Sequence, residues 1–374
     1  TIFYNTNMRI ALNTRFLIEG KMEGFGWVTY EVCKRLTEMH PEHTFYLLFD
    51  RKYDDRFVFG DNCIPVILRP PARHPILFHF WFDYSVTYAL KKFKIDAFFS
   101  PDGYLSKRTK VPQYNIIHDL NFEHYPEDLP KKHLRYYTKN FPLFAEKAKH
   151  IFTVSNFSKE DIIQQYGIDE SKITVAYNGV NTIFNPIAEE DKEKVRKQYS
   201  KGKEFFLFVG ALHPRKNLKR LLEAYLKMVE ESNSETQLVI VGAPLWKNLP
   251  DISEEKNQNI HFTGRLVSEE LAKVMASAKA LTFIPYFEGF GMPMIEAMRS
   301  GTPVLAANTS CLPEIAGDAA LYVNPFEIES IKAGLLQMDH DQKLRAHLSA
   351  NGLERAKDFN WDNTATIISK ELRL

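Results

Sequence analysis

Short β-rich runs alternate with amphipathic stretches along nearly the whole chain. A short apolar run bounded by turn residues is typical of a buried strand, and apolar residues at helical spacing indicate a helix packed on a sheet. Repeated alternation of the two favours parallel sheets covered by helices. The predicted strands are Arg9–Asn13, Thr44–Phe49, Pro65–Leu68, Ala97–Ser100, Tyr114–His118, Ile151–Ser155, Ile173–Ala176, Phe205–Val209, Gln237–Val241, Ile260–Thr263, Leu281–Ile284, Val304–Ala306 and Ala320–Val323. The predicted helices include Val28–Glu38, His133–Lys149, Lys159–Tyr166, a helix within Glu189–Lys203 and a final one at Thr364–Leu372, with others beginning near Leu218, Ser268, Pro293 and Glu327.

The length of 374 residues exceeds what one hydrophobic core normally supports, so two domains are expected. The sharpest change in composition follows Asn178-Gly179-Val180-Asn181, where Asn185-Pro186 and a strongly charged stretch come next. Asn-Gly and Asn-Pro are turn sequences. We therefore predict two doubly wound Rossmann-like α/β domains, residues 1–182 and 183–356. Because ligands of open α/β sheets bind beyond the carboxyl ends of the strands, the two domains are expected to face each other across a cleft.

The composition is that of a soluble globular protein, with 44% hydrophobic and 25% charged residues. A formal net charge of +1 argues against wholesale nucleic-acid binding. No apolar run approaches the roughly 18 residues of a membrane span, and the start of the sequence has no signal-peptide pattern. Cys33, Cys63 and Cys311 are scattered without metal-ligand spacing, so we expect reduced thiols in a cytoplasmic protein.

Two glutamates, Glu288 and Glu296, lie on either side of a glycine-rich turn. Pro293 suits a first helical turn because it has no N–H to lose, so Glu288 is expected on the loop after a strand and Glu296 at the start of a helix. The free N–H groups of that helix would face the space between the carboxylates. This arrangement favours a sugar diphosphate, whose hydroxyls need acceptors and whose phosphates need donors. The alternative is compensation of the helix dipole next to an ordinary tight turn.

A second informative segment follows the predicted strand Phe205–Val209. Gly210 ends the strand, Arg215 and Lys216 follow on its exit loop, and Asn217 is predicted to cap the next helix. A bidentate guanidinium and a mobile ammonium together suit a pyrophosphate. The alternative is a solvated pair of charges on a loop.

With these two segments, the chain resembles the retaining GT-B glycosyltransferases marked by Glu-x7-Glu, the group one glycosyltransferases. It is most similar to the branch with Pro-Arg-Lys-Asn after the first strand of the C-terminal domain, to which several mannosyltransferases of surface-polysaccharide biosynthesis belong. The resemblance implies a GT-B fold in which a last helix, within residues 357–374, crosses back to the N-terminal domain. It also implies that a hexose moves with retention from a nucleotide sugar to a glycan or lipid-linked glycan acceptor.

The donor implied by that branch is GDP-mannose. A UDP-sugar-dependent glucosyl or GlcNAc transferase of the same fold stays open, as does a deoxysugar nucleotide. A catalytically idle sugar-nucleotide-binding module is a further alternative. An epimerase or dehydrogenase would need a dinucleotide fingerprint, which would require glycine where Thr29 stands, or a Tyr-x-x-x-Lys pair.

The resemblance also assigns roles to individual residues. Glu288 would hold hydroxyls of the donor sugar and Glu296 the ribose, while Arg215 and Lys216 would bind the diphosphate and stabilise it as leaving group. The backbone amides expected to add donors to the same phosphates are those of Phe290, Gly291 and Met292. Many relatives carry a basic residue directly after the strand-end glycine, where this chain has Ala211.

Further roles come from other strand ends. His118 would reach the donor sugar near the reacting carbon. Gly24 and Gly26, in a segment that follows the first strand and opens a helix, stand in the position of the glycine-rich loop that approaches the diphosphate or the acceptor. Gly210 would lie against the phosphates and Arg265 near the nucleotide base. No Asp-x-Asp stands where a divalent ion would bridge phosphates, so neither a metal nor another cofactor is expected, and the nucleotide sugar is a co-substrate.

The acceptor is expected to bind the N-terminal domain, where residues 91–149 contain 12 Lys and Arg against 7 Asp and Glu. Cations and aromatics interleave there at Lys131, Lys132, Arg135, Tyr136, Tyr137, Lys139 and Phe141. A basic, aromatic helix suits peripheral binding to the inner face of a membrane that carries lipid-linked acceptors. The alternative is a solvated helix whose aromatics face the core. The aromatics Phe78, Phe80, Trp81, Phe82 and Tyr84 are predicted to be core, with a sugar-binding platform as the alternative.

Overall fold

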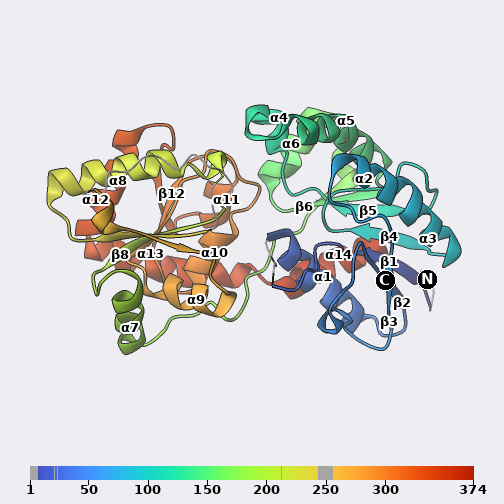
Figure 1. Cartoon of the computed structure of the whole chain (residues 1–374), viewed down its shortest axis with the longest axis horizontal. Coiled ribbons are helices and arrows are strands. Elements are labelled where there is room, and N and C mark those ends of the chain that lie inside the picture. The colour runs from blue at the N-terminus through green and yellow to red at the C-terminus, as the bar shows by residue number, and fades with distance from the viewer. Residues whose placement is uncertain (1–6, 21, 23, 212, 243–255) are drawn as a thin grey trace. The chain divides into compact units, whose positions relative to one another are not determined.

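The computed structural model describes residues 7–20, 22, 24–211, 213–242 and 256–374 (Figure 1). The chain forms two compact units. The N-terminal unit combines Thr1–Gly179 with Asn360–Leu374, and the C-terminal unit is Val180–Phe359. Each unit is a parallel sheet covered by helices, as the alternation of strand and helix patterns predicted.

The N-terminal unit has a seven-stranded parallel sheet of order β3-β2-β1-β4-β5-β6-β7. Its central strand β1 pairs with β2 and β4, so that Ala11 lies opposite both Tyr46 and Phe98. The strand order reverses between β1 and β4, which is the point where ligands of such sheets bind. The strands are β1 (Arg9–Asn13), β2 (Thr44–Phe49), β3 (Cys63–Ile67), β4 (Ala97–Ser100), β5 (Gln113–Ile116), β6 (His150–Thr153) and β7 (Ile173–Val175).

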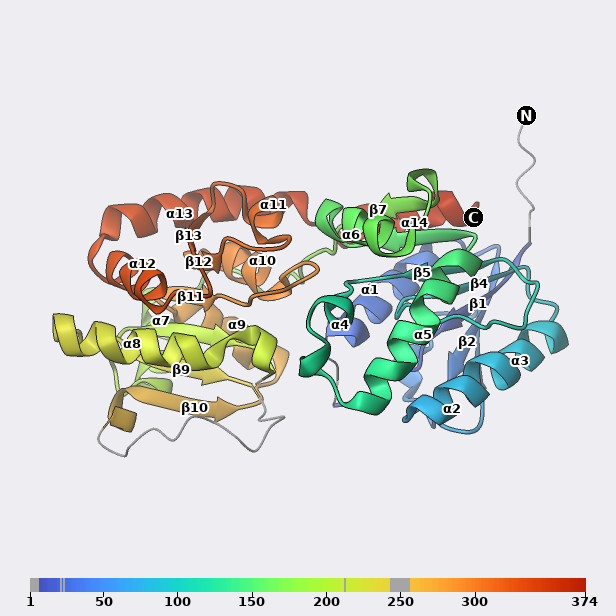
Figure 2. The ribbon, with the colours of Figure 1, turned by 90° about the horizontal axis from the view of Figure 1, so that it is seen from above.

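Helices α2, α3 and α5 cover one face of this sheet, and α1 packs with α14 on the other (Figure 2). A π-helical turn, Trp81–Val86, joins α2 to α3. The hydrophobic core under α2, α3 and α5 includes Trp81, Phe82 and Phe144, all buried. The helices are α1 (Gly24–Met39), α2 (Pro75–Phe80), α3 (Thr87–Lys92), α4 (Asn121–His124), α5 (Lys131–Lys147), α6 (Asn156–Tyr166) and α14 (Trp361–Leu372).

The C-terminal unit has a six-stranded parallel sheet of order β10-β9-β8-β11-β12-β13. The strand order reverses between β8 and β11, where Leu207 pairs with Leu281. Ligands are therefore expected beyond the carboxyl ends of these two strands. The strands are β8 (Phe205–Val209), β9 (Gln237–Val241), β10 (Ile260–Gly264), β11 (Ala280–Phe283), β12 (Val304–Ala307) and β13 (Ala320–Val323).

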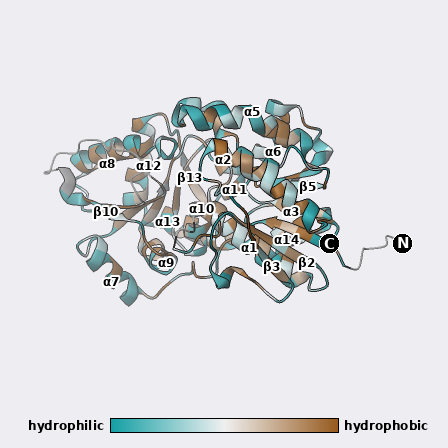
Figure 3. Ribbon diagram, turned by 45° about the vertical axis from the view of Figure 1, so that its right-hand side comes forward, coloured by the Kyte–Doolittle hydropathy of each residue, from teal (hydrophilic) through white to brown (hydrophobic). Residues whose placement is uncertain are grey.

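Helices α8 and α12 cover one face of the second sheet, and α7 and α9 the other (Figure 1). Helix α7 is a surface helix. It is drawn almost entirely in hydrophilic colours, and Val195 is its one buried residue (Figure 3). The helices are α7 (Glu189–Tyr199), α8 (Leu218–Ser232), α9 (Ser268–Ser277), α10 (Met292–Arg299), α11 (Leu312–Ala316), α12 (Ile328–His340) and α13 (Gln342–Arg355).

The C-terminal helix α14 belongs to the N-terminal unit, which confirms the predicted return of the chain. Asp362 pairs with Arg35 of α1 at 2.5 Å, and the Thr364 hydroxyl donates to the carbonyl of Tyr177 at 2.5 Å. Gly179 lies so close to Trp361 that a β-carbon at residue 179 would overlap the Trp361 backbone nitrogen. The chain can therefore return only because residue 179 is glycine.

Several details of the sequence interpretation differ from the structure. The aromatics between Phe78 and Tyr84 are not all core, because the side chains of Phe80 and Tyr84 are 46% and 47% exposed. Strand β5 ends at Ile116, so His118 lies two residues beyond the strand and not at its last position. The predicted helical patterns also omit α2 and α3, whose apolar residues do not follow one α-helical period through the π-helical turn.

Candidate functional site

The exit loop of β8 is held against the end of β11. Residues Pro214–Lys216 form a 3₁₀ turn that begins with the backbone N–H of Arg215 donating to His213 Nδ1 at 3.3 Å. Asn217 precedes α8 in the left-handed conformation, with φ 61°, and its side chain does not cap the helix. The side-chain amide donates instead to the carbonyls of Ile284 at 3.1 Å and Pro325 at 2.7 Å. Asn217 thus fixes the loop that carries the two cations.

Arg215 and Lys216 converge on the buried carboxylate of Glu288. The Arg215 guanidinium donates to Oε1 at 2.5 Å, and the Lys216 ammonium donates to the same oxygen. Glu288 is 6% exposed. Burial alone would raise the pKa of Glu288, but the two cations outweigh it and lower the pKa below its usual value. The structure therefore holds Glu288 ionised between the carboxyl ends of β8 and β11.

The Glu288 loop is anchored on its other side. The backbone N–H of Glu288 donates to the hydroxyl of Ser310 at 3.1 Å, and Arg215 also donates to the carbonyl of Phe287 at 3.2 Å. Lys216 extends along Gly210 and places its ammonium 4.9 Å from the centre of the Phe283 ring. Gly210 has φ 153°, a conformation that favours glycine, and the Lys216 side chain passes beside it at an ordinary van der Waals distance.

Helix α10 begins at Met292, one residue before the predicted start. Gly291 precedes it with φ 92°, a conformation that favours glycine, and a β-carbon there would make a close contact of 3.0 Å with the Leu312 side chain. Phe290 is buried and packs edge-on against Phe359, with ring centres 5.6 Å apart. The three predicted phosphate donors, Phe290, Gly291 and Met292, therefore lie at the N-terminus of α10.

Glu296 lies in the second turn of α10 and is half-buried. Among the described residues, no side chain or backbone group hydrogen-bonds or pairs with its carboxyl group. Burial raises the pKa of Glu296 to about 7. The two glutamates of the motif thus differ sharply, because Glu288 is held ionised by cations and Glu296 titrates near neutral pH.

Arg265 follows β10 at the carboxyl edge of the same sheet. It is exposed, and β10 is the edge strand, separated from β8 by β9. Arg265 thus lies at the carboxyl edge of the sheet but away from the strands that carry Glu288 and the two cations.

In the N-terminal unit, His118 is oriented by the loops around it. Its Nε2 is 2.7 Å from the carbonyl of Pro101, so Nε2–H donates there and Nδ1 is left as an acceptor. Its ring is edge-on to Phe25, with centres 4.7 Å apart. Burial lowers the pKa of His118, which favours the neutral ring. Ser158 fixes the backbone by donating to the His118 carbonyl at 3.0 Å.

The glycine-rich segment at residues 24–27 follows β1 and opens a helix, as predicted. Helix α1 begins at Gly24, so Gly24 and Gly26 lie in its first turn. A β-carbon at Gly26 would lie 3.0 Å from the carbonyl oxygen of Phe16. Gly26 therefore allows the loop after β1 to pass close to the start of α1.

The sequence reasoning missed Arg15, which lies at the reversal point of the N-terminal sheet. Its guanidinium is buried, pairs with Asp102 at 2.5 Å and lies 4.4 Å from the centre of the Tyr104 ring. Asn13 donates to the other oxygen of Asp102 at 2.9 Å. In the sequence, Arg15 could have been singled out as a cation two residues after β1. The aromatic rings around it come from distant segments.

Comparison with known proteins agrees with this architecture. A family model described as glycosyl transferases group 1 matches residues 189–355, and one described as glycosyltransferase family 4 matches residues 22–184. O-antigen chain mannosyltransferase B of Escherichia coli is 31% identical over 284 residues, which cover 75% of this chain and 74% of that protein. The serotype-specific mannosyltransferase WbdA of Escherichia coli is 27% identical over 260 residues, 67% of this chain but only 32% of WbdA.

Among solved structures, HepE of Anabaena in complex with UDP-glucose matches with a TM-score of 0.73. The sequences are 17% identical, and the match covers 98% of this chain and 99% of HepE, which shows a common fold. The chain therefore belongs to the group 1 glycosyltransferases and has their GT-B fold of two Rossmann-like units.

Proposed function

We propose that this glycosyltransferase transfers mannose from GDP-mannose to a glycan or lipid-linked glycan, with retention of configuration and without a metal ion. The observation that carries the proposal is the pair of cations on one oxygen of buried Glu288 at the reversal point of the C-terminal sheet. The mannosyl group is supported by the two relatives named above, both of which are mannosyltransferases.

The two oxygens of Glu288 suit different tasks. Oε1 holds Arg215 and Lys216, whereas Oε2 accepts no hydrogen bond from any residue in the described ranges. We assign Oε2 to hydroxyls of the donor sugar. The diphosphate would share the two cations with Oε1, so that the sugar and the leaving group are held by one connected set of charges.

Cleavage of the sugar–phosphate bond places positive charge on the anomeric carbon and negative charge on the departing diphosphate. Preorganised donors at the leaving group lower this barrier, and Arg215, Lys216 and the N-terminus of α10 would supply them. The acceptor hydroxyl oxygen forms the new bond to the anomeric carbon as the phosphate bond breaks, and its proton passes to the departing phosphate oxygen. Glu288 is a poor nucleophile because the oxygen Oε1 is neutralised by two cations.

The remaining roles follow from the hydrogen-bond capacity of each group. Glu296 in its ionised form accepts from both ribose hydroxyls, which would supply partners for its carboxylate. His118 offers Nδ1 as an acceptor for a sugar hydroxyl, since Nε2–H donates to Pro101. Gly24, Gly26, Gly210 and Arg265 keep the roles near phosphate, acceptor and base that the family resemblance implies.

A UDP-sugar is the second candidate donor, and the fold shared with HepE bound to UDP-glucose favours it. A thermal-shift panel of GDP-mannose, UDP-glucose and UDP-GlcNAc, each with and without EDTA, separates the two. Stabilisation by GDP-mannose alone supports the proposal, stabilisation by UDP-sugars alone overturns the donor, and loss of the effect with EDTA overturns metal independence. Donor binding without transfer or slow hydrolysis would indicate an idle binding module.

We also propose that the protein binds the surface of a membrane that carries its acceptor. In α5, Tyr136, Tyr137 and Phe141 pack against the aromatic core, as the alternative interpretation of this helix expected, and the cations point outward. The exposed aromatic surface lies instead on α2 to α3. We call it the α2–α3 stripe, and its residues with their exposed fractions are Ile76 62%, Phe80 46%, Tyr84 47% and Tyr88 64%.

The α2–α3 stripe has the composition of an interfacial surface. Its residues are four apart, and the wider π-helical turn keeps residues at this spacing aligned better than an α-helix would. Arg108 lies 4.4 Å from the centre of the Tyr84 ring and Lys92 lies 5.9 Å from that of Tyr88, so cations flank the aromatics. Such a surface suits an anionic bilayer. In the described part of the chain, no helix is long and apolar enough to cross a membrane.

A further inference from the structure

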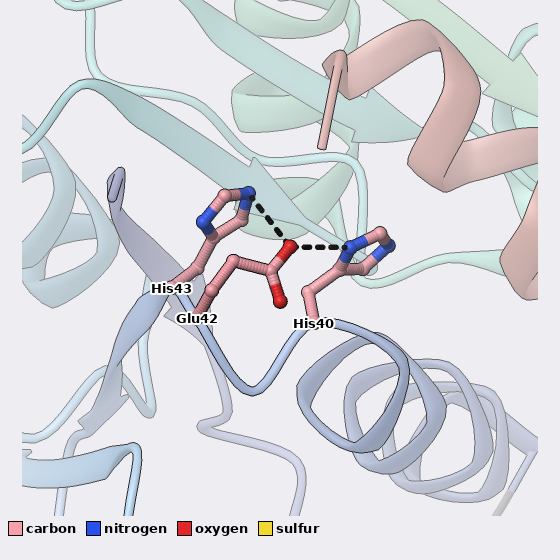
Figure 4. A group of neighbouring side chains, drawn as sticks. All are labelled: His40, Glu42 and His43. Carbon is pink, nitrogen blue, oxygen red and sulfur yellow. Dashed lines mark ion pairs between the residues drawn. The ribbon is translucent and has the colours of Figure 1, made fainter. Parts of the chain in front are cut away.

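Three potential metal ligands lie together on the turn between α1 and β2, at His40, Glu42 and His43 (Figure 4). Glu42 Oε1 is 3.4 Å from His40 Nδ1 and 3.8 Å from His43 Nε2. One ligand atom from each residue lies within 4.8 Å of the other two. Both imidazoles point at the same carboxylate oxygen, as the dashed lines in Figure 4 show.

His43 supplies a second, independent observation. The residue is 4% exposed, and its Nε2 is buried without a hydrogen-bond partner among the described residues. A buried polar nitrogen without a partner is uncommon, because it has lost its contact with water and gained nothing in return. This nitrogen faces the Glu42 carboxylate and His40 (Figure 4).

We propose that His40 Nδ1, the Glu42 carboxylate and His43 Nε2 bind one Zn²⁺. Two imidazoles and one carboxylate are a ligand set for zinc, with water in a fourth position, whereas Mg²⁺ and Ca²⁺ prefer oxygen ligands. Bonds of about 2.0–2.2 Å in tetrahedral geometry put ligand atoms about 3.4 Å apart. The two distances to Glu42 match that value or exceed it slightly, and the ligand atoms of the two histidines lie within 4.8 Å of each other, so side-chain rotation has to complete the geometry.

Zinc binding would remove one hydrogen bond from His43. Its Nδ1 accepts a long hydrogen bond of 3.4 Å from the backbone N–H of Met8. Coordination through Nε2 puts the ring proton on Nδ1, so the bond from Met8 is given up in exchange for the metal bond. Met8 is held in place independently, because its carbonyl accepts from the backbone N–H of Thr44 at 2.9 Å. Metal binding should therefore change hydrogen exchange at Met8.

The site also reaches the C-terminal helix. His40 Nε2 lies 2.7 Å from the hydroxyl of Ser369 on α14. With the metal on Nδ1, the ring proton sits on Nε2 and donates to this hydroxyl, an outer contact of the kind that orients metal-binding histidines. Zinc would thus join the turn after α1 to the helix that closes the N-terminal unit. This inference does not depend on the proposed roles of Arg215, Lys216 and Glu288, which lie in the other unit.

Isothermal titration of EDTA-treated full-length protein with ZnCl₂ tests the proposal. We expect one Zn²⁺ per chain, a rise in Tm with Zn²⁺ but not with Mg²⁺ or Ca²⁺, and loss of both in Glu42→Gln. Glu42 is exposed, so this variant should keep its fold and its metal-free Tm. Ser369→Ala should weaken binding by roughly 10–100-fold. His340→Gln, an exposed histidine of the C-terminal unit, is the matched control and should bind as the parent does.

Two results would overturn the proposal. The first is no one-site Zn²⁺ isotherm and no Zn²⁺-dependent rise in Tm. The second is equal Zn²⁺ binding by the parent and by Glu42→Gln and His40→Gln, which would indicate adsorption to scattered histidines. Neither result requires a measurement of glycosyl transfer.

Discussion

Arg215 and Glu288, 73 residues apart in sequence, form an ion pair of 2.5 Å that joins the exit loops of neighbouring strands β8 and β11. Glu288 is almost completely buried, and Lys216 donates to the same carboxylate oxygen as Arg215. The loop charges therefore depend on each other, and a change in any one of them alters the environment of the other two.

Glu288→Gln should separate transfer from nucleotide binding. The variant loses the carboxylate that orients the donor sugar, so kcat/KM should fall by roughly 10²-fold or more. The two cations lose their competing partner, so GDP should bind as well as before or more tightly by calorimetry. Glu354→Gln, on an exposed helix surface, is the control. Near-parental transfer by Glu288→Gln would refute the role of Glu288.

Lys216→Ala should act on the leaving group. We expect kcat to fall by roughly 10²–10³-fold, because one donor to the departing diphosphate is removed. Lys219→Ala, three residues later on the exposed surface of α8, should leave turnover unchanged. Steady-state kinetics with the preferred donor measures both variants. An equal small effect in both would refute the leaving-group role of Lys216.

Glu296 should make nucleotide binding dependent on pH. Its raised pKa of about 7 means that the group is protonated at lower pH, whereas the ribose hydroxyls need the ionised form. Affinity should thus fall as pH drops below about 7, by up to about tenfold per pH unit, with proton release on binding. Glu296→Gln should remove this dependence. Calorimetry of GDP between pH 5.5 and 8.5 in two buffers tests it, and a flat profile in the parent would contradict the assignment.

The raised pKa of Glu296 also predicts how the stability of the fold depends on pH. Because the folded-state pKa of Glu296 is above its unfolded value, its contribution to the free energy of unfolding is fully present below the unfolded pKa, near 4.5. The contribution is lost as pH rises through about 7. Glu296→Gln should therefore raise Tm more at pH 8 than at pH 5, and an equal change at both would contradict the shift.

The α2–α3 stripe should control membrane binding. Tyr84→Ser and Tyr88→Ser should each weaken binding to phosphatidylglycerol vesicles several-fold, because partial burial of an aromatic side chain contributes about 1 kcal/mol. Binding should also weaken with added salt, since Arg108 and Lys92 flank the stripe. Leu353→Ser, an exposed leucine of the C-terminal unit, is the control. Equal sedimentation of parent and variants with the vesicles would rule out this surface.

The strands were predictable because buried parallel strands are short and apolar, and those at β1, β2, β4, β8, β9 and β13 match residue for residue. The chain order then placed Arg215 and Glu288 after strands without further information, and placed His118 at a strand end that the structure puts two residues earlier. Contacts between distant segments were not predictable. Asn217 looks like a helix cap in the sequence, yet it bonds to Ile284 and Pro325. Arg15 is identified only by the aromatics that surround it in the folded unit.

The return of α14 to the N-terminal unit has a consequence for biosynthesis. The C-terminal unit is a continuous segment, Val180–Phe359, and all of its strands leave the ribosome before residue 360 does. The N-terminal unit is complete only after Asn360–Leu374 has been synthesised. Until then, α14 does not pack against α1. The unit that begins first in the sequence is thus the one that is completed last.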